Sequence, residues 1–162
     1  MDRFSHYIDV FPAADKTAES TVAALRAFLG GLKAQRIYCD GSQELKSACN
    51  SLQILPDTST PNRPETNGVA ERAVRRVSEG TRSVLLQSGL PHRWWAEAAR
   101  CFCFLRNVCD PADGNSTFTP YQLRHKADFR GKIIPFASLV HYKPSSEKKI
   151  APLDKYGSRK VP

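Results

Sequence analysis

The spacing of apolar residues predicts short strands and helices that alternate through the first third of the chain. Residues 4–11 contain Tyr, Ile, Val and Phe, which favour strands, and residues 36–40 form a shorter strand-like run that ends at a glycine. Between these two runs, apolar residues of 16–29 recur at helical spacing, which predicts a helix. A brief helix is expected over 43–52.

Helical patterns dominate the second half of the chain. Three prolines among Thr, Ser and Asn predict a loop without regular structure over 56–66. We expect a long helix over 67–87, a second helix over 91–106, a short helix that starts at Thr119, and a late strand over 137–142. Strands and helices in this order predict an α/β fold in which helices flank a mixed sheet.

The length and composition indicate a globular chain with one main domain. Its 162 residues suit a single domain, and a hydrophobic fraction of 41% supplies enough apolar side chains for a core. We place the main domain at residues 1–110 and a partly disordered extension at 111–162. No apolar run reaches the length of a membrane span, and the first residues do not open a signal peptide.

The charge indicates what kind of partner to expect, and the cysteine content indicates the redox compartment. The chain holds 24 Lys and Arg against 16 Asp and Glu, a formal net charge of +8, which favours a polyanion such as nucleic acid as a partner. The alternative is that these side chains only keep the surface hydrated. The five cysteines form no Cys-x-x-Cys pair, so we expect a reducing compartment and neither a zinc site nor a disulfide framework.

Three carboxylates occupy positions from which they can meet at one edge of a sheet. Asp2 precedes the first expected strand, Asp40 ends the second, and Glu71 lies in the first turns of the long helix. Three such oxygen ligands suit Mg²⁺ or Mn²⁺. Two ions roughly 3.5–4 Å apart would clamp the attacking and leaving oxygens of a phosphoryl transfer. Taken singly, each acid has a simpler interpretation: Asp2 as a solvated terminus, Asp40 as a turn residue, and Glu71 as a favourable contact with the helix dipole.

The segments around these acids resemble copia-type retrotransposon integrases. The most specific stretch is STPNRPETNGVAER at 59–72, which is similar to the family's sequence before and around its catalytic glutamate. The blocks YCDGSQEL at 38–45 and DRFSHY at 2–7 resemble the family's two aspartate blocks. Similarity continues through LPHRWWAEA at 90–98 and TPY at 119–121, so the resemblance spans nearly the whole chain.

This resemblance implies a fold, a reaction and a set of ligands. The implied fold is RNase H-like, with Asp2, Asp40 and Glu71 as catalytic residues and as ligands of two Mg²⁺ or Mn²⁺ ions. The implied reaction is DNA integration, in which a polynucleotidyl transferase joins retroelement DNA ends to target DNA. We further expect a fragment of a Gag-Pol polyprotein that forms a homo-oligomer when complete, has no membrane partner and acts in the nucleus, although no import signal is visible.

A row of basic side chains follows Glu71 along the long helix. At 3.6 residues per turn, one stripe is formed by Glu71, Arg75, Ser78 and Arg82. The opposite, apolar face consists of Ala73, Val74, Val77, Thr81 and Val84. Guanidinium groups in such a row can grip phosphates beside the reacting bond, whereas the simpler interpretation is a solvated helix face. The expected nucleic-acid contacts, including a helix-capping asparagine, are Asn67, Arg72, Arg75, Ser78 and Arg82.

Departures from the family pattern keep other interpretations open. Gly41 directly follows Asp40, where the family usually has Asn, and the interval from Asp40 to Glu71 is shorter than usual. Asp2 is almost the first residue, so the strand that carries it is expected to be truncated. The alternative to an active transferase is therefore an inactive relic with the same fold that binds nucleic acid. A different nuclease of the RNase H-like class would share the same carboxylate pattern.

Overall fold

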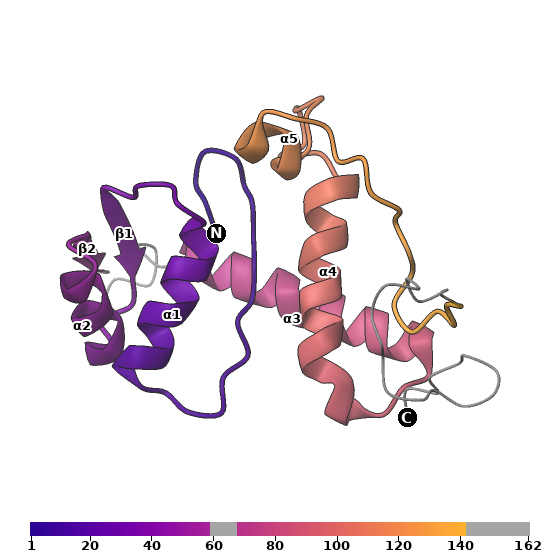
Figure 1. Cartoon of the computed structure of the whole chain (residues 1–162), viewed down its shortest axis with the longest axis horizontal. Coiled ribbons are helices and arrows are strands. Elements are labelled where there is room, and N and C mark those ends of the chain that lie inside the picture. The colour runs from indigo at the N-terminus through magenta and orange to yellow at the C-terminus, as the bar shows by residue number, and fades with distance from the viewer. Residues whose placement is uncertain (59–67, 142–162) are drawn as a thin grey trace, which may run out of the picture.

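The computed structural model describes residues 1–58 and 68–141, in which helices flank a small sheet that lies at one side of the molecule (Figure 1). In chain order the elements are α1 (Ala18–Leu29), β1 (Arg36–Cys39), α2 (Gln43–Ser51), β2 (Leu55–Thr58), α3 (Gly68–Ser88), the 3-10 helix η2 (His92–Trp94), α4 (Trp95–Cys109) and α5 (Pro120–His125). The predicted helices are all present in these ranges. Within the described residues, no helix is both long enough and apolar enough to cross a membrane.

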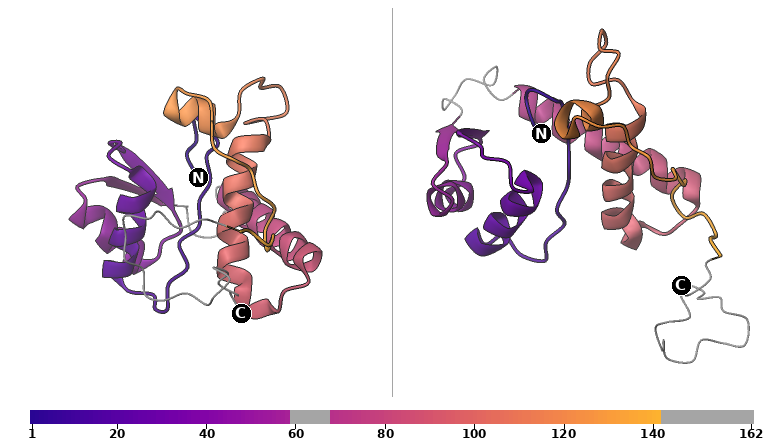
Figure 2. Two further views of the ribbon diagram at one scale, coloured as in Figure 1. Left: turned by 45° about the vertical axis from the view of Figure 1, so that its right-hand side comes forward. Right: turned by 45° about the horizontal axis from the view of Figure 1, so that its top comes forward.

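The elements form two groups that lie side by side (Figures 1 and 2). One group contains α1, α2 and the β1–β2 pair, and in the other α4 packs across α3 and against α5. The N-terminal segment runs between the two groups as an extended chain. This arrangement confirms the predicted α/β class.

Local capping explains where two of the helices begin and end. The side chain of Thr17 accepts a hydrogen bond from Ser20 N at 3.2 Å, which satisfies a free donor at the start of α1. Gly30 follows α1 with φ of 57°, a left-handed conformation that glycine adopts without steric cost. At α5, Thr119 and Gln122 form a reciprocal capping box.

The β1–β2 pair is parallel and corrects the loop predicted from residue 56 onward. Ile37 of β1 is aligned with Pro56, which stands inside β2. Leu55 N donates to Gln35 O, so the alternation of a strand turns the nitrogen of Pro56 away from β1. Proline is therefore tolerated at this edge. Residues 59–67, which hold the rest of the predicted loop, lie outside the described residues.

The two terminal strands that the apolar pattern predicted are not formed. Residues 3–5 form a turn and residues 7–11 are not paired in a strand; the side chain of Asn107 on α4 hydrogen-bonds instead to the backbone N–H and C=O of buried Ile8. Residues 137–141 also lack strand pairing, and Leu139 is 82% exposed. Residue 142 and the polar tail beyond it lie outside the described residues. Strand propensity alone does not supply the neighbour that a strand requires.

Close packing between α3 and α4 forms a large part of the core. A Cβ on Gly80 of α3 would lie 2.1 Å from the ring of Phe102 on α4, so only glycine allows this approach. Thr81 of α3 is buried, as the apolar face predicted, and Leu85, which was not assigned to that face, is buried as well. Val74 corrects that prediction, because it is 66% exposed and lies on the side of α3 that faces β1.

The burial of the cysteines predicts that one thiol reacts much faster than the others. Burial raises the pKa of Cys103 to about 12. It also raises the pKa of three other thiols, those of Cys39, Cys49 and Cys101. Cys109, at the end of α4, is exposed. Because the thiolate is the reactive form, a thiol reagent at neutral pH should show one rapid phase that Cys109→Ser removes and Cys101→Ser leaves. Two or more rapid thiols in the native protein would contradict this packing.

Candidate functional site

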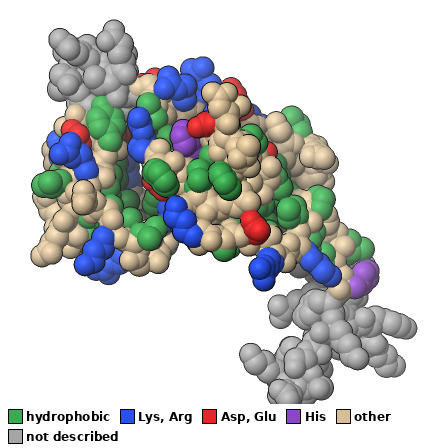
Figure 3. Space-filling view, turned by 90° about the horizontal axis from the view of Figure 1, so that it is seen from above, with side chains coloured by type: hydrophobic (Ala, Val, Ile, Leu, Met, Phe, Trp, Pro, Cys, Tyr) green, Lys and Arg blue, Asp and Glu red, His purple; other side chains and the backbone are tan. Residues whose placement is uncertain are grey.

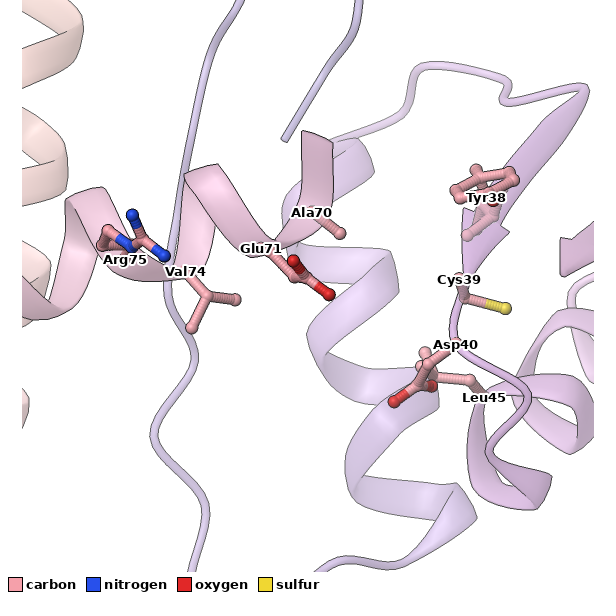
Figure 4. A pocket seen from close by; sticks show the side chains of 9 residues that line it. Tyr38, Cys39, Asp40, Leu45, Ala70, Glu71, Val74 and Arg75 are labelled. Carbon is pink, nitrogen blue, oxygen red and sulfur yellow. The ribbon is translucent and has the colours of Figure 1, made fainter. Parts of the chain in front are cut away.

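A pocket of about 500 Å³ separates the end of β1 from the first turns of α3 (Figure 4). Asp40 directly follows β1, and Glu71 lies in the first turn of α3. Both side chains line the pocket, together with Ile37, Tyr38, Cys39, Leu45, Ala70, Val74 and Arg75. Two of the three predicted ligands are thus brought to one place from elements that are far apart in the sequence.

The two carboxylates point into the space between their elements (Figure 4). Both side chains are exposed to solvent, and Asp40 Oδ1 accepts a hydrogen bond from Ser42 N at 3.3 Å. That bond orients Asp40 at the start of α2, while the helical backbone of α3 orients Glu71. Carboxylate oxygens that converge from two sides match the donor preference of Mg²⁺ and Mn²⁺.

The third predicted ligand, Asp2, does not line this pocket. Its carboxylate accepts hydrogen bonds from Ser5 Oγ at 2.5 Å and from Phe4 N at 3.1 Å. Partial burial raises the pKa of Asp2, but these hydrogen bonds outweigh burial and the net pKa is lowered. No group of three metal-binding side chains occurs within residues 1–58 and 68–141. The donor set therefore fits a divalent ion at two of its three carboxylates.

The N-terminal end of the chain nevertheless lies on the same side of the molecule as Glu71. All three ribbon views place this end beside the first turns of α3 (Figures 1 and 2). The extended segment that follows runs between the two groups of elements rather than away from them. The first residues therefore lie on the same side as the first turns of α3, although none of them lines the pocket.

The basic row predicted along α3 is exposed. Arg72, Arg75, Ser78 and Arg82 are all accessible to solvent, and Arg75 also lines the pocket beside Glu71. Asn67, the remaining predicted contact, lies outside the described residues. Figure 3 shows Lys and Arg spread over the face seen from above, with apolar side chains between them. Within this row, Arg75 is the basic residue that lines the pocket.

The pocket contains an apolar wall that sequence reasoning did not identify. Tyr38 and Val74 lie on opposite sides of the pocket, on β1 and α3 (Figure 4). Residues two apart in a strand share a face, so the position of Tyr38 relative to Asp40 was an available signal. The position of Val74 in the pocket could not be predicted, because helical periodicity placed this residue on the apolar face of the helix.

Comparison with known proteins relates the chain to retroelements. No family model matches the chain. Over 82 residues it is 37% identical to the "Retrovirus-related Pol polyprotein from transposon TNT 1-94" of Nicotiana tabacum. The match covers 48% of this chain but only 6% of that polyprotein, so the chain corresponds to a small part of its relative.

Solved structures with a similar fold are retroviral integrases. The fold matches a simian T-cell lymphotropic virus intasome in complex with PP2A regulatory subunit B56 gamma (TM-score 0.63, 23% identity, 88% of this chain and 52% of that chain). It also matches the catalytic core domain of BIV integrase (TM-score 0.54, 18% identity, 75% and 80%). A third match is the HTLV-2 integrase catalytic core domain in complex with magnesium (TM-score 0.59, 24% identity, 76% and 80%). The chain thus has the fold of a retroviral integrase catalytic core and is similar in sequence to a retrotransposon Pol polyprotein, which confirms its resemblance to copia-type integrase cores.

Proposed function

We propose that this chain is the catalytic part of a retroelement integrase, a metal-dependent polynucleotidyl transferase that joins retroelement DNA ends to target DNA. The observation that carries the proposal is the convergence of Asp40 and Glu71, from β1 and α3, on one pocket. The sequence similarity to a retrotransposon Pol polyprotein supports it. In the cell, such a chain would act in the nucleus as part of a homo-oligomer.

The charged side chains have separate roles in this proposal. Asp40 and Glu71 would hold a divalent ion, and the bound metal would stabilise the negative charge that develops during phosphoryl transfer. The exposed guanidinium groups of Arg72, Arg75 and Arg82 would bind the phosphates that flank the reacting bond.

The direct test is metal-dependent strand transfer or disintegration on labelled DNA ends. Product should form with Mg²⁺ or Mn²⁺, disappear when EDTA removes the ion, and return when Mn²⁺ is added in excess. EDTA-treated protein must keep its circular dichroism spectrum, so that loss of product reports loss of metal rather than unfolding. Product formation that is indifferent to EDTA would contradict the proposal.

A second candidate function is DNA binding without chemistry, by an inactive integrase relic. The observation that favours it is the state of Asp2, whose carboxylate is engaged by Ser5 and Phe4 and does not line the pocket. Such a protein would bind DNA through phosphate contacts, and its affinity would fall steeply with salt.

A salt titration with matched arginine variants tests this candidate. The slope of log affinity against log salt concentration should become shallower by about one in Arg75→Ala, which is the contribution of one phosphate contact. Arg130→Ala, at an exposed position outside α3, should leave it unchanged. Salt-sensitive binding without metal-dependent product favours the relic, and binding that does not respond to salt excludes it.

A further inference from the structure

The pocket between β1 and α3 has an apolar part that the two carboxylates leave unused. Ile37, Leu45 and Ala70 are half-buried in it, while Tyr38 is 43% exposed and Val74 is 66% exposed. An aromatic and an aliphatic side chain are thus open to solvent on the walls of a concave site. Its volume of about 500 Å³ suits a small ligand, since such sites span roughly 300–1,000 Å³.

The two exposed walls suit a flat ring. Tyr38 and Val74 stand on opposite sides of the pocket, on β1 and α3 (Figure 4). A flat ring that enters between them would meet an aromatic ring on one face and methyl groups on the other. Proteins commonly hold unpaired nucleobases by stacking them on aromatic side chains, and any base can be held because every base has a π face.

The charges at the pocket separate the base of a nucleotide from its phosphate. Asp40 and Glu71 disfavour an anionic group beside them, whereas a nucleobase is uncharged. Arg75 follows Glu71 by one turn of α3, is exposed, and lines the same pocket. Its guanidinium group can bind a phosphate through two parallel hydrogen bonds. A phosphate attached to a base at the apolar wall would therefore be attracted to Arg75.

A base that is stacked within a duplex cannot use these walls. Both of its faces are covered by neighbouring bases, so its ring is not available to a side chain. Taking a base out of the stack costs free energy, and this cost is least where the base is mismatched or already single-stranded. A DNA end with an unpaired base is therefore the form of DNA that fits the pocket.

We propose that this pocket holds one unpaired nucleotide at a DNA end, with its base between Tyr38 and Val74 and its phosphate on Arg75. The inference rests on the proposed function, which supplies DNA as the ligand, and adds the form of DNA that the site selects. Tyr38 and Val74 are specificity-determining residues, because they distinguish an unpaired end from a paired one.

The test compares two hairpin DNAs of equal length that differ only in the last base pair of their open end. One is fully paired, and the other ends in a mismatch that contains 2-aminopurine, a base whose fluorescence falls when it stacks. Both carry 3′-dideoxy ends, so that Mg²⁺ can be present without strand transfer. Their equal numbers of phosphates make the salt-dependent part of the affinity the same. The unchanged protein should bind the mismatched end about 5- to 100-fold more tightly, the range that stacking of one base provides.

Variants of Tyr38 show whether its ring causes this preference. Tyr38→Ala should lose most of the preference for the mismatched end, whereas Tyr38→Phe should keep it because the ring remains. The matched control is Phe118→Ala, since Phe118 is an aromatic residue that is 56% exposed and does not line the pocket. An equal preference in Tyr38→Ala and Phe118→Ala would overturn the inference.

Val74 supplies a second variant in case Tyr38→Ala does not fold. Its side chain is 66% exposed, so Val74→Asn should keep the circular dichroism spectrum of the unchanged protein. Its preference for the mismatched end should fall, because a polar amide replaces the methyl groups that contact the base. The fluorescence of the unpaired 2-aminopurine should also fall when the unchanged protein binds. Constant fluorescence would show that the base is not stacked and would contradict the inference.

The outcomes separate this inference from the proposed function. If metal-dependent product forms but the unchanged protein binds both DNAs equally, the integrase function stands and the nucleotide pocket fails. If the mismatched end is preferred through Tyr38 but no metal-dependent product forms, the nucleotide pocket stands and the proposed chemistry fails. A protein that binds neither DNA contradicts both.

Discussion

Replacing Glu71 with glutamine should lower metal-dependent strand transfer about 1,000-fold, which corresponds to about 4 kcal/mol of lost transition-state stabilisation. The substitution keeps the size of the side chain and its place in the first turn of α3, but removes the negative charge that faces Asp40 across the pocket. A neutral amide oxygen is a much weaker ligand for Mg²⁺ than a carboxylate, so the ion would be lost or misplaced. Strand transfer on labelled DNA ends, measured with saturating Mn²⁺, gives the rate.

Glu79 of the same helix supplies the matched control. It is an exposed glutamate of α3 that does not line the pocket, so Glu79→Gln should retain nearly full activity. DNA binding should survive both substitutions, because each removes a negative charge from a surface that faces a polyanion. Activity of Glu71→Gln equal to that of Glu79→Gln would remove Glu71 from the catalytic site.

Replacing Arg106 with alanine should lower the free energy of unfolding by about 3 kcal/mol. Its side chain is 8% exposed, and it donates to Pro111 O at 3.2 Å and to Ala112 O at 3.4 Å. The truncated side chain would leave these carbonyls without their charged donor and would open a gap beside α4. The ion pair with Asp110, at 3.8 Å, adds little because that carboxylate is more than half exposed.

Urea denaturation, followed by circular dichroism, measures this loss. Arg100→Ala is the matched control, since Arg100 lies on the same helix and is exposed to solvent. The control should change the free energy of unfolding by less than about 0.5 kcal/mol. Equal midpoints for the two variants would show that the turn after α4 does not depend on Arg106.

The helices and the place of two carboxylates were predictable because their signals are local. Thr17 and Gly30 mark the ends of α1 by capping chemistry that needs no tertiary contact. Asp40 after a short strand, and Glu71 at the start of a long helix, are positions that an α/β fold can bring together at one edge of its sheet. Periodicity also identified the side of α3 that carries Arg75 and Arg82.

The N-terminal segment was not predictable, because its conformation depends on a residue far along the chain. Nothing in the composition of residues 4–11 shows that the amide of Asn107 would take the place of a neighbouring strand. Val74 was misplaced for a similar reason, since the pocket that it lines on α3 is completed by β1, which lies far away in the sequence. Pro56 was assigned to a loop because propensity does not reveal which strand edge remains unpaired.

The bond between Ile8 and Asn107 has a consequence for the order of folding. Closing a loop between residues 99 positions apart costs more conformational entropy than forming a local contact does. The segment around Ile8 is therefore among the last parts of the chain to reach its native place, after α4 has been synthesised and has packed on α3. A nascent or truncated chain that ends before α4 would leave the backbone groups of Ile8 without this partner, so burial of Ile8 would report that α4 has packed.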